Sequence, residues 1–345
     1  MAQVSPQVTD HGGGVRSIRV PIPDNPLGYT LVYVVDTDGG PVLVDTGWDD
    51  PASWDTLTAG LAACGTSPAG IHGVVITHHH PDHHGLSGQV RDASGAWIAM
   101  HAADAAIVRR TGETRPERWF AYMTAKLEAA GAPEDHLAPL RAARPRRLPG
   151  FSPAVPDREI VPGDLLPLPG RRLRAIWTPG HTPGHVCLHL EEQHPAQLPG
   201  HGRLFSGDHL LPEITPHIGL YEDPDDATVT DPLGDYLDSL ERVGRLAPAE
   251  ILPAHQYVFT DAPARVRELL THHEERLDGL RMLLVEPLTP WQVAERMEWN
   301  RPWSEIPYGS RNIAVSEAEA HLRRLVKLGR AEAVAGSEPV TYVAV

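Results

Sequence analysis

The chain has 345 residues, of which 41% are hydrophobic and 22% are charged, a composition typical of a folded protein with a full apolar core. Its 45 acidic and 30 basic side chains give a net charge of −15, which disfavours nucleic acid and anionic lipid as partners. Two cysteines predict no disulfide framework, and we expect a cytoplasmic protein because no leader peptide or membrane-spanning run is evident.

The chain is expected to begin with a disordered or extended segment, residues 1–15, and then to alternate strands with helices. Strands are expected over short apolar runs rich in β-branched residues, at 16–22, 29–35, 41–45, 74–76, 97–101, 173–177, 186–190, 203–208 and 251–255. Helices are expected near 51–64 and, from a leucine stripe, over 233–246.

A helical insertion over 102–147 separates two of these strands and contains Trp119, Phe120 and Tyr122. The aromatic cluster fits either a piece of core or a lid over a binding site. As a lid it would supply apolar walls suited to an acyl chain.

After residue 260 the sequence predicts three helices and a hairpin, a winged-helix-like outline for a C-terminal domain over 262–345. Thr289 and Pro290 are expected to begin the second helix. Ser316 and Glu319 have the spacing of a capping box for the third. This domain carries 11 basic and 12 acidic residues, so it has no basic footprint for nucleic acid.

The stretch HHHPDHHG, residues 78–85, begins where the strand at 74–76 is expected to end. In extended backbone His78 and His80 lie on the same side, and Asp82 and His83 follow in the turn. Imidazole and carboxylate ligands suit zinc, iron or manganese, but one ion cannot easily use all four and leave room for a substrate. We therefore expect two ions.

Three further ligand candidates follow later strands: His181 in TPGHTPGH, Asp208 in SGDH and His255 in LPAH. Rigid strands present loop residues of this kind to binding sites. Singly, each fits a structural histidine or a turn-capping aspartate. Together with the histidine run they indicate a metal site.

The motif HxHxDH and the three downstream elements resemble those of the metallo-β-lactamase-fold hydrolases, the superfamily that includes hydroxyacylglutathione hydrolase. The resemblance covers a catalytic domain over about 16–261 and implies an αββα sandwich with two divalent ions at one edge, zinc first, with iron or manganese as alternatives. It implies that the first ion is held by His78, His80 and His181, the second by Asp82, His83 and His255, and that Asp208 bridges them. The last element reads PAHQ where family members commonly have PGHG.

Other residues are expected beside the ligands. The resemblance implies that Asp45 in VDTG lies next to the metal site. His84, His185 and His209 adjoin candidate ligands, and each fits either a residue that orients a ligand imidazole or a solvated or packed histidine. His217 and Tyr221 are candidate donors to an oxyanion. We interpret the remaining histidines considered as solvated, packed or surface residues: His79, His272, His273 and His321.

The function implied is that of a hydrolase in which a hydroxide bridging two metals attacks a carbonyl or phosphoryl centre, while Asp82 orients it and carries a proton. A small acyl thioester, ester or lactone is the expected substrate, because the insertion as a lid would supply apolar walls. Asp208 disfavours a β-lactamase, because most β-lactamases of the superfamily lack a bridging aspartate at that position. An endoribonuclease or phosphodiesterase is the alternative, on the resemblance of the tail to that of RNA-cleaving members. A β-lactamase, a mononuclear iron oxygenase and a non-enzymatic metal protein are weaker interpretations, and a homo-oligomer is left open.

Overall fold

The computed structural model describes residues 7–113, 116–143, 153–221 and 228–345. The parts of the predicted N-terminal segment and of the predicted insertion that fall at 1–6, 114–115 and 144–147 lie outside these residues. The chain folds into two compact units, each made of separate stretches: 1–112, 148–216 and 239–266 in the first unit, and 113–147, 217–238 and 267–345 in the second.

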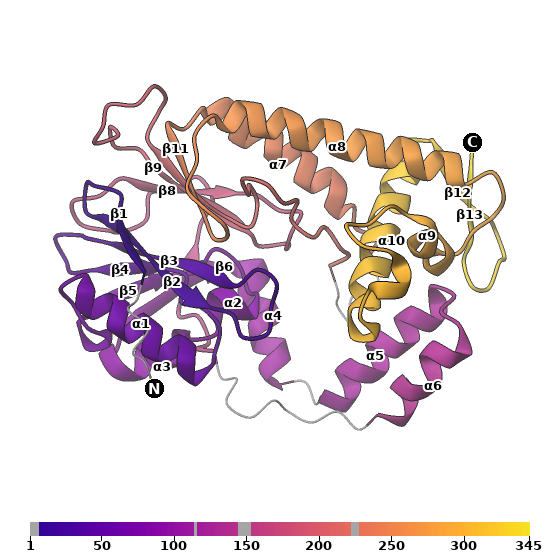
Figure 1. Ribbon diagram of the computed structural model, residues 1–345, viewed down its shortest axis with the longest axis horizontal. Coiled ribbons are helices and arrows are strands. Elements are labelled where there is room, and N and C mark those ends of the chain that lie inside the picture. The colour runs from indigo at the N-terminus through magenta and orange to yellow at the C-terminus, as the bar shows by residue number, and fades with distance from the viewer. Residues whose placement is uncertain (1–6, 114–115, 144–152, 222–227) are drawn as a thin grey trace. The chain divides into compact units, whose positions relative to one another are not determined.

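The first unit contains two β-sheets (Figure 1). The seven-stranded sheet runs in chain order through β1 Val8–Asp10, β2 Val15–Pro21, β3 Tyr29–Val35, β4 Val42–Val44, β5 Gly73–Val75, β6 Trp97–His101 and β7 Arg158–Ile160. The four-stranded sheet has the order β11-β10-β9-β8, from β8 Leu173–Trp177, β9 Val186–Leu190, β10 Arg203–Gly207 and β11 Glu250–Pro253. Strands β1 to β4 pair antiparallel, whereas β4 to β7 pair parallel, as does β10 with β11.

The first unit also contains helices, two of which continue into the second unit. The helices are α1 Pro51–Ala63, α2 Pro81–His84, α3 Ser87–Ser94, α4 Ala102–Glu113, α7 Pro232–Leu246 and α8 Ala262–Leu283, with a 3-10 turn at Pro68–Gly70. The last two helices run from one unit into the other.

Successive side chains of β3 point to opposite faces of the seven-stranded sheet, and each face packs against a different layer. Leu31, Tyr33 and Val35 point into a core that also contains inward residues of the four-stranded sheet. Val32 and Val34 point to the other face and join the core beneath α1 and α3. The apolar residues of a single strand thus hold a sheet-on-sheet core and a helix-on-sheet core, which is the predicted mixed α/β sandwich.

Tyr33 connects the two sheets directly. Its ring meets Phe205 of β10 edge to face at a centroid distance of 5.1 Å, and its hydroxyl donates to the carbonyl oxygen of Pro253 at 2.7 Å. The carbonyl belongs to the end of β11, so this bond fixes the strand end from which His255 follows.

The second unit is mainly helical. It contains α5 Pro116–Ala129, α6 Glu134–Ala142, α9 Pro290–Arg296, α10 Arg311–Lys327, 3-10 turns at Trp303–Glu305 and Tyr308–Ser310, and the antiparallel strands β12 Ala331–Ala333 and β13 Tyr342–Ala344. The predicted order of helices and hairpin is present, and the winged-helix resemblance stays a prediction. α5 and α6, from the predicted insertion, belong to this unit together with the C-terminal helices.

Two predictions in this unit differ in outcome. Thr289 caps α9 as expected, in a capping box with Gln292. The capping box predicted from Ser316 and Glu319 is wrong, because α10 already begins at Arg311 and both residues lie inside it. Among the described residues, no helix is long and apolar enough to cross a bilayer.

Candidate metal centre

The histidine run follows β5, as predicted. His78 is fully buried, and His80 ends the loop before α2, whose first residue is Pro81. Proline suits this first helical position because its ring fixes φ and its missing N–H is not needed there. Asp82 and His83, expected in a turn, lie in this single helical turn and face the same site as His78.

The three downstream candidates are buried and follow the ends of β8, β10 and β11. Asp208 follows Gly207, which has φ +50° and leaves no room for a side chain, because a Cβ there would lie 2.6 Å from His185 Nε2. That Nε2 accepts the backbone N–H of Asp208 at 3.2 Å. Glycine at 207 and histidine at 185 together set the direction in which the Asp208 carboxylate points.

The structure brings all seven predicted ligands together in overlapping groups. In the first group, His80 Nδ1 lies 3.1 Å from His78 Nε2 and 3.0 Å from His181 Nε2. In the second group, Asp82 Oδ2 lies 3.5 Å from His83 Nε2 and 3.3 Å from His255 Nε2.

Asp208 faces both groups, one with each carboxylate oxygen. Its Oδ2 lies 3.5 Å from His181 Nε2. Its Oδ1 lies 3.4 Å from His83 Nε2 and 3.2 Å from His255 Nε2. This carboxylate is therefore placed to be shared between the two groups.

These separations fit metal ions better than direct hydrogen bonds. Nitrogen and oxygen ligands at 2.0–2.1 Å from a tetrahedral zinc lie about 3.3 Å from one another. His83 Nε2 and His255 Nε2 lie 3.4 Å and 3.2 Å from Asp208 Oδ1, and all three atoms are buried without a hydrogen-bond partner. Buried ligand-type atoms left unpaired at these separations suit a shared cation.

Outer hydrogen bonds hold the ligand rings in one orientation. Asp45 Oδ2 accepts from His83 Nδ1 at 2.8 Å, and the carbonyl oxygen of Tyr29 accepts from His255 Nδ1 at 2.9 Å. Because Nδ1 carries the proton in each ring, the lone pair of Nε2 is directed inward. Asp45 lies beside the site, as the sequence predicted, with an unusual φ of +60°.

Thr77 extends this arrangement to the first group. Its hydroxyl lies 2.9 Å from Asp45 Oδ2 and 3.1 Å from His78 Nδ1. Burial, reinforced by neighbouring histidines, holds the pKa values of His78 and His80 well below the ordinary value. Both rings are therefore neutral at pH 7, which is the form that binds metal.

In the second group the histidine pKa values are raised instead of lowered. Burial opposes protonation of His255, but the close carboxylates of Asp208 and Asp82 raise its pKa to about 10. Against the same effect of burial, these carboxylates also raise the pKa of His83 well above its usual value. The carboxylates attract positive charge into the site, and a divalent cation would supply it in place of protons.

Of the residues predicted to support the ligands, His185 has a defined role. Because its Nε2 accepts from Asp208, the neutral ring carries its proton on Nδ1, which donates to Thr178 Oγ1 at 2.8 Å. His209 is buried nearby, with its ring centroid 5.9 Å from that of His185. Burial lowers the pKa of His209 to about 3, so this ring is neutral as well.

The sequence did not single out Asp104, which is fully buried in the first turn of α4. It accepts hydrogen bonds from His79, Thr182 and Gly184, in the two loops that carry the first group of ligands. His79, interpreted as solvated or packed, is thus part of this arrangement. The signal available in the sequence was the position of Asp104, three residues after a strand that borders the histidine strand in the sheet.

The other predicted site residues lie in the second unit. His217 Nδ1 lies 3.1 Å from Glu317 Oε2, and the Tyr221 hydroxyl donates to Asp235 Oδ2 at 3.3 Å. Trp119 and Tyr122 pack against each other on α5 with centroids 5.6 Å apart. Roles for these residues, and for Phe120, toward a substrate stay predictions.

The histidines expected at the surface of this unit need correction. His273 and His321 are buried, with 2% and 0% of their surface exposed. His321 Nδ1 donates to the backbone oxygen of Glu317 at 2.8 Å, and His273 Nδ1 lies 3.4 Å from His321 Nε2. The helical pattern alone did not separate these buried positions from the exposed ones.

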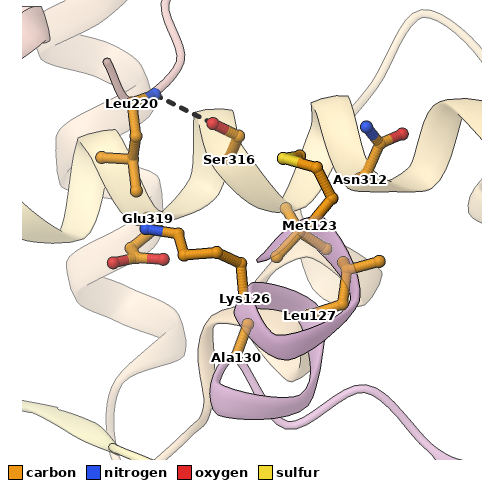
Figure 2. A pocket seen from close by; sticks show the side chains of 9 residues that line it. Met123, Lys126, Leu127, Ala130, Leu220, Asn312, Ser316 and Glu319 are labelled. Atoms are coloured by element: carbon orange, nitrogen blue, oxygen red, sulfur yellow. Dashed lines mark hydrogen bonds between the residues drawn. The ribbon is translucent and has the colours of Figure 1, made fainter. Parts of the chain in front are cut away.

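Figure 2 shows a pocket of the second unit between α5, α10 and Leu220. Ser316 accepts the backbone N–H of Leu220 there at 2.9 Å, which is its role in place of helix capping. The cavity has a volume of about 20 Å³, enough for about one water molecule and not for an acyl substrate.

Comparisons with known proteins agree with this geometry. Residues 25–255 match the family model described as the metallo-beta-lactamase superfamily. A metallo-beta-lactamase family protein of Thermus thermophilus has a similar structure, with a TM-score of 0.76, 29% identity and coverage of 96% of this chain and 99% of that one. The probable metallo-hydrolase YqjP of Bacillus subtilis is 26% identical over 82% of this chain and 84% of its own length.

A fungal relative, the lactamase-like protein nscB of Aspergillus fumigatus, is 32% identical over 134 residues. The match covers 39% of this chain and 34% of that protein, so this chain spans about a third of the length of that relative.

Proposed function

Because the chain belongs to the metallo-β-lactamase superfamily, whose members are metal-dependent hydrolases, we propose that it is a two-metal hydrolase of an acyl thioester, ester or lactone. The observation that carries the proposal is the placement of Asp208, with Oδ2 toward His181 and Oδ1 toward His83 and His255. A carboxylate that serves two groups of ligands supports two ions more than one, and this argues against a mononuclear oxygenase.

The residues would divide as the resemblance implies, with His78, His80 and His181 for one ion and Asp82, His83 and His255 for the other, joined by Asp208. A pair of divalent cations, zinc in the first instance, would supply a nucleophilic water at neutral pH and an electrophile for the scissile carbonyl.

The protein contributes orientation and a proton carrier. The Asp82 side chain is 14% exposed, slightly more than that of Asp208 at 12%, and its Oδ2 lies 3.3 Å from His255 Nε2. Opposing effects act on Asp82: burial raises its pKa, while His83 and His255 lower it below the usual value. It is therefore ionised at neutral pH and can accept a proton from the attacking water and release it to the leaving group.

The preference for an uncharged acyl substrate is supported by charge. The net charge of −15 and the nearly balanced C-terminal unit oppose binding of a polyanion. An endoribonuclease or phosphodiesterase is the second candidate, on the resemblance of the C-terminal helices and hairpin alone. The relative YqjP, named a probable metallo-hydrolase, supports hydrolysis without distinguishing these substrates.

The test is to measure metal per purified chain and then to assay thioesters, lactones, phosphodiesters and single-stranded RNA with and without a chelator. We expect two ions per chain and chelator-sensitive cleavage of at least one acyl substrate, restored by zinc. Asp82→Asn should lose this activity, whereas Asp157→Asn, a change of the same kind on a carboxylate that accepts the Ile98 N–H, should retain it. Cleavage of RNA alone would replace the acyl proposal with the second candidate.

A further inference from the structure

The two loops that supply the first group of ligands come from distant parts of the chain. His78 and His80 lie in the loop after β5, and His181 lies in the loop after β8, in the other sheet. His80 Nδ1 lies 3.1 Å from His78 Nε2 and 3.0 Å from His181 Nε2, although the sheets that carry these loops differ. A specific connection between the loops is therefore needed close to the ligands.

Asp104 makes this connection through four hydrogen bonds. Its Oδ2 accepts the His79 backbone N–H at 2.9 Å and His79 Nδ1 at 3.0 Å, so one carboxylate oxygen holds the residue between His78 and His80. The same oxygen accepts the Thr182 hydroxyl at 2.8 Å, next to His181, and Oδ1 accepts the Gly184 N–H at 2.6 Å. All four donors belong to the two ligand loops and none to α4 itself.

Asp104 is tightly packed against the loop after β8. The side chain is 0% exposed, and burying a carboxylate is costly unless it is well hydrogen bonded. A Cβ on Gly184 would lie 2.5 Å from Asp104 Oδ1 and 2.6 Å from the Asp104 backbone nitrogen. The loop after β8 can therefore approach this closely only with glycine at 184.

A second buried aspartate serves the other group in a comparable way. Asp45 accepts from His83 Nδ1 at 2.8 Å and from the Thr77 backbone N–H at 2.8 Å. Asp45 thus holds His83 of the second group directly and reaches His78 of the first group only through Thr77, whereas Asp104 contacts the loops of the first group alone.

We propose that Asp104 is a positioning residue that joins the His78–His80 loop to the His181 loop and thereby sets the affinity of the first metal ion. The inference rests on the proposed pair of metal ions. The four hydrogen bonds of Asp104 go to neighbours of the ligands, so it acts through the placement of the loops.

The experiment measures the two stepwise zinc affinities of the full chain by competition with a chromophoric chelator. Asp104→Asn replaces one acceptor oxygen with an amide donor and should lower one stepwise affinity by about 10–100-fold, the usual effect of losing an outer partner of a ligand, while the other changes little. Thr182→Val removes a single hydroxyl donor and should lower the same affinity by a smaller factor. This milder change covers the case in which Asp104→Asn does not fold.

The comparison with Asp45→Asn identifies which ion is affected. It should lower mainly the other stepwise affinity, because Asp45 binds His83 directly and reaches His78 only through Thr77, and the double variant Asp104→Asn/Asp45→Asn should lower both. Asp157→Asn is the control that removes a carboxylate of the same unit whose hydrogen bond goes to Ile98 and not to either loop.

Unfolding of the metal-free variants separates positioning from general stability. A merely structural role would lower the metal-free unfolding midpoint and weaken both ions equally, which would overturn the inference. Wild-type affinity for both ions in Asp104→Asn would overturn it as well. If the wild-type chain itself binds fewer than two ions, the proposed function fails before the variants are compared.

Discussion

Replacing Asp208 by asparagine should remove the connection between the two proposed metal ions. The structure places one carboxylate oxygen 3.5 Å from His181 Nε2 and the other 3.2 Å from His255 Nε2, so both oxygens are in use. In asparagine one of them becomes an amide nitrogen, which carries two hydrogens and cannot bind a cation.

The expected loss of metal affinity can be estimated from the known effect of removing residues that hydrogen-bond to metal ligands. Loss of a residue that only orients a ligand costs about 10–100-fold in metal affinity. Loss of a ligand oxygen, together with one negative charge from a buried site, should cost at least about 100-fold for one ion, or about 2.7 kcal/mol. Metal content after dialysis against a weak chelator measures this, and hydrolysis of the best acyl substrate should fall in parallel.

Two results would refute the reasoning for Asp208. The first is an Asp208→Asn variant that keeps both ions at wild-type affinity, since the carboxylate would then not be shared. The second is loss of metal only in variants whose metal-free form is also unfolded, which far-UV circular dichroism of the metal-free proteins would detect.

Two further predictions concern stability. Gly73→Ala should lower the free energy of unfolding by about 1–3 kcal/mol in denaturant titrations, because the added Cβ would lie 2.1 Å from Trp97 Cε2. Gly279→Ala is the control, since a Cβ there meets open space on helix α8 and should be neutral or stabilising. Equal effects of the two changes would contradict the packing described. Burial raises the pKa of Glu317, but hydrogen bonding and attraction from His217 outweigh burial and lower it to about 2 from 4.5. Its contribution is therefore full above about pH 4.5 and is lost as the pH falls toward 2, so Glu317→Gln should unfold with a weaker dependence on pH across this window, and an unchanged acid transition would count against the pairing.

The grouping of the candidate ligands was predictable because their chemistry and their position at strand ends are both visible in the sequence. His78, Asp208 and His255 needed only the knowledge that neighbouring strand ends meet in space. Asp104 was not predictable in this way. A single aspartate early in a helix usually interacts with its own helix terminus, and only the folded chain shows that its carboxylate oxygens serve two distant loops.

The errors in the C-terminal unit have a common physical origin. Ser316 and Glu319 satisfy the spacing of a capping box, but the preceding residues from Arg311 continue the helix, and the Ser316 hydroxyl accepts the backbone N–H of Leu220. His273 and His321 were placed at the surface because histidine is polar, whereas the helix packing buries both. Local spacing cannot report which partner a polar group finds in the tertiary structure.

The residue after His255 has a consequence for how this protein can change. Gln256 adopts φ +69°, a conformation that favours glycine, and its Oε1 accepts the backbone N–H groups of Glu213 at 3.1 Å and Ile214 at 3.4 Å. Glycine would adopt this conformation without strain. With glutamine, the turn depends on the hydrogen bonds to Glu213 and Ile214, in the segment that follows Asp208. An insertion or deletion within residues 209–214 would therefore disturb two candidate ligands, Asp208 and His255, at once.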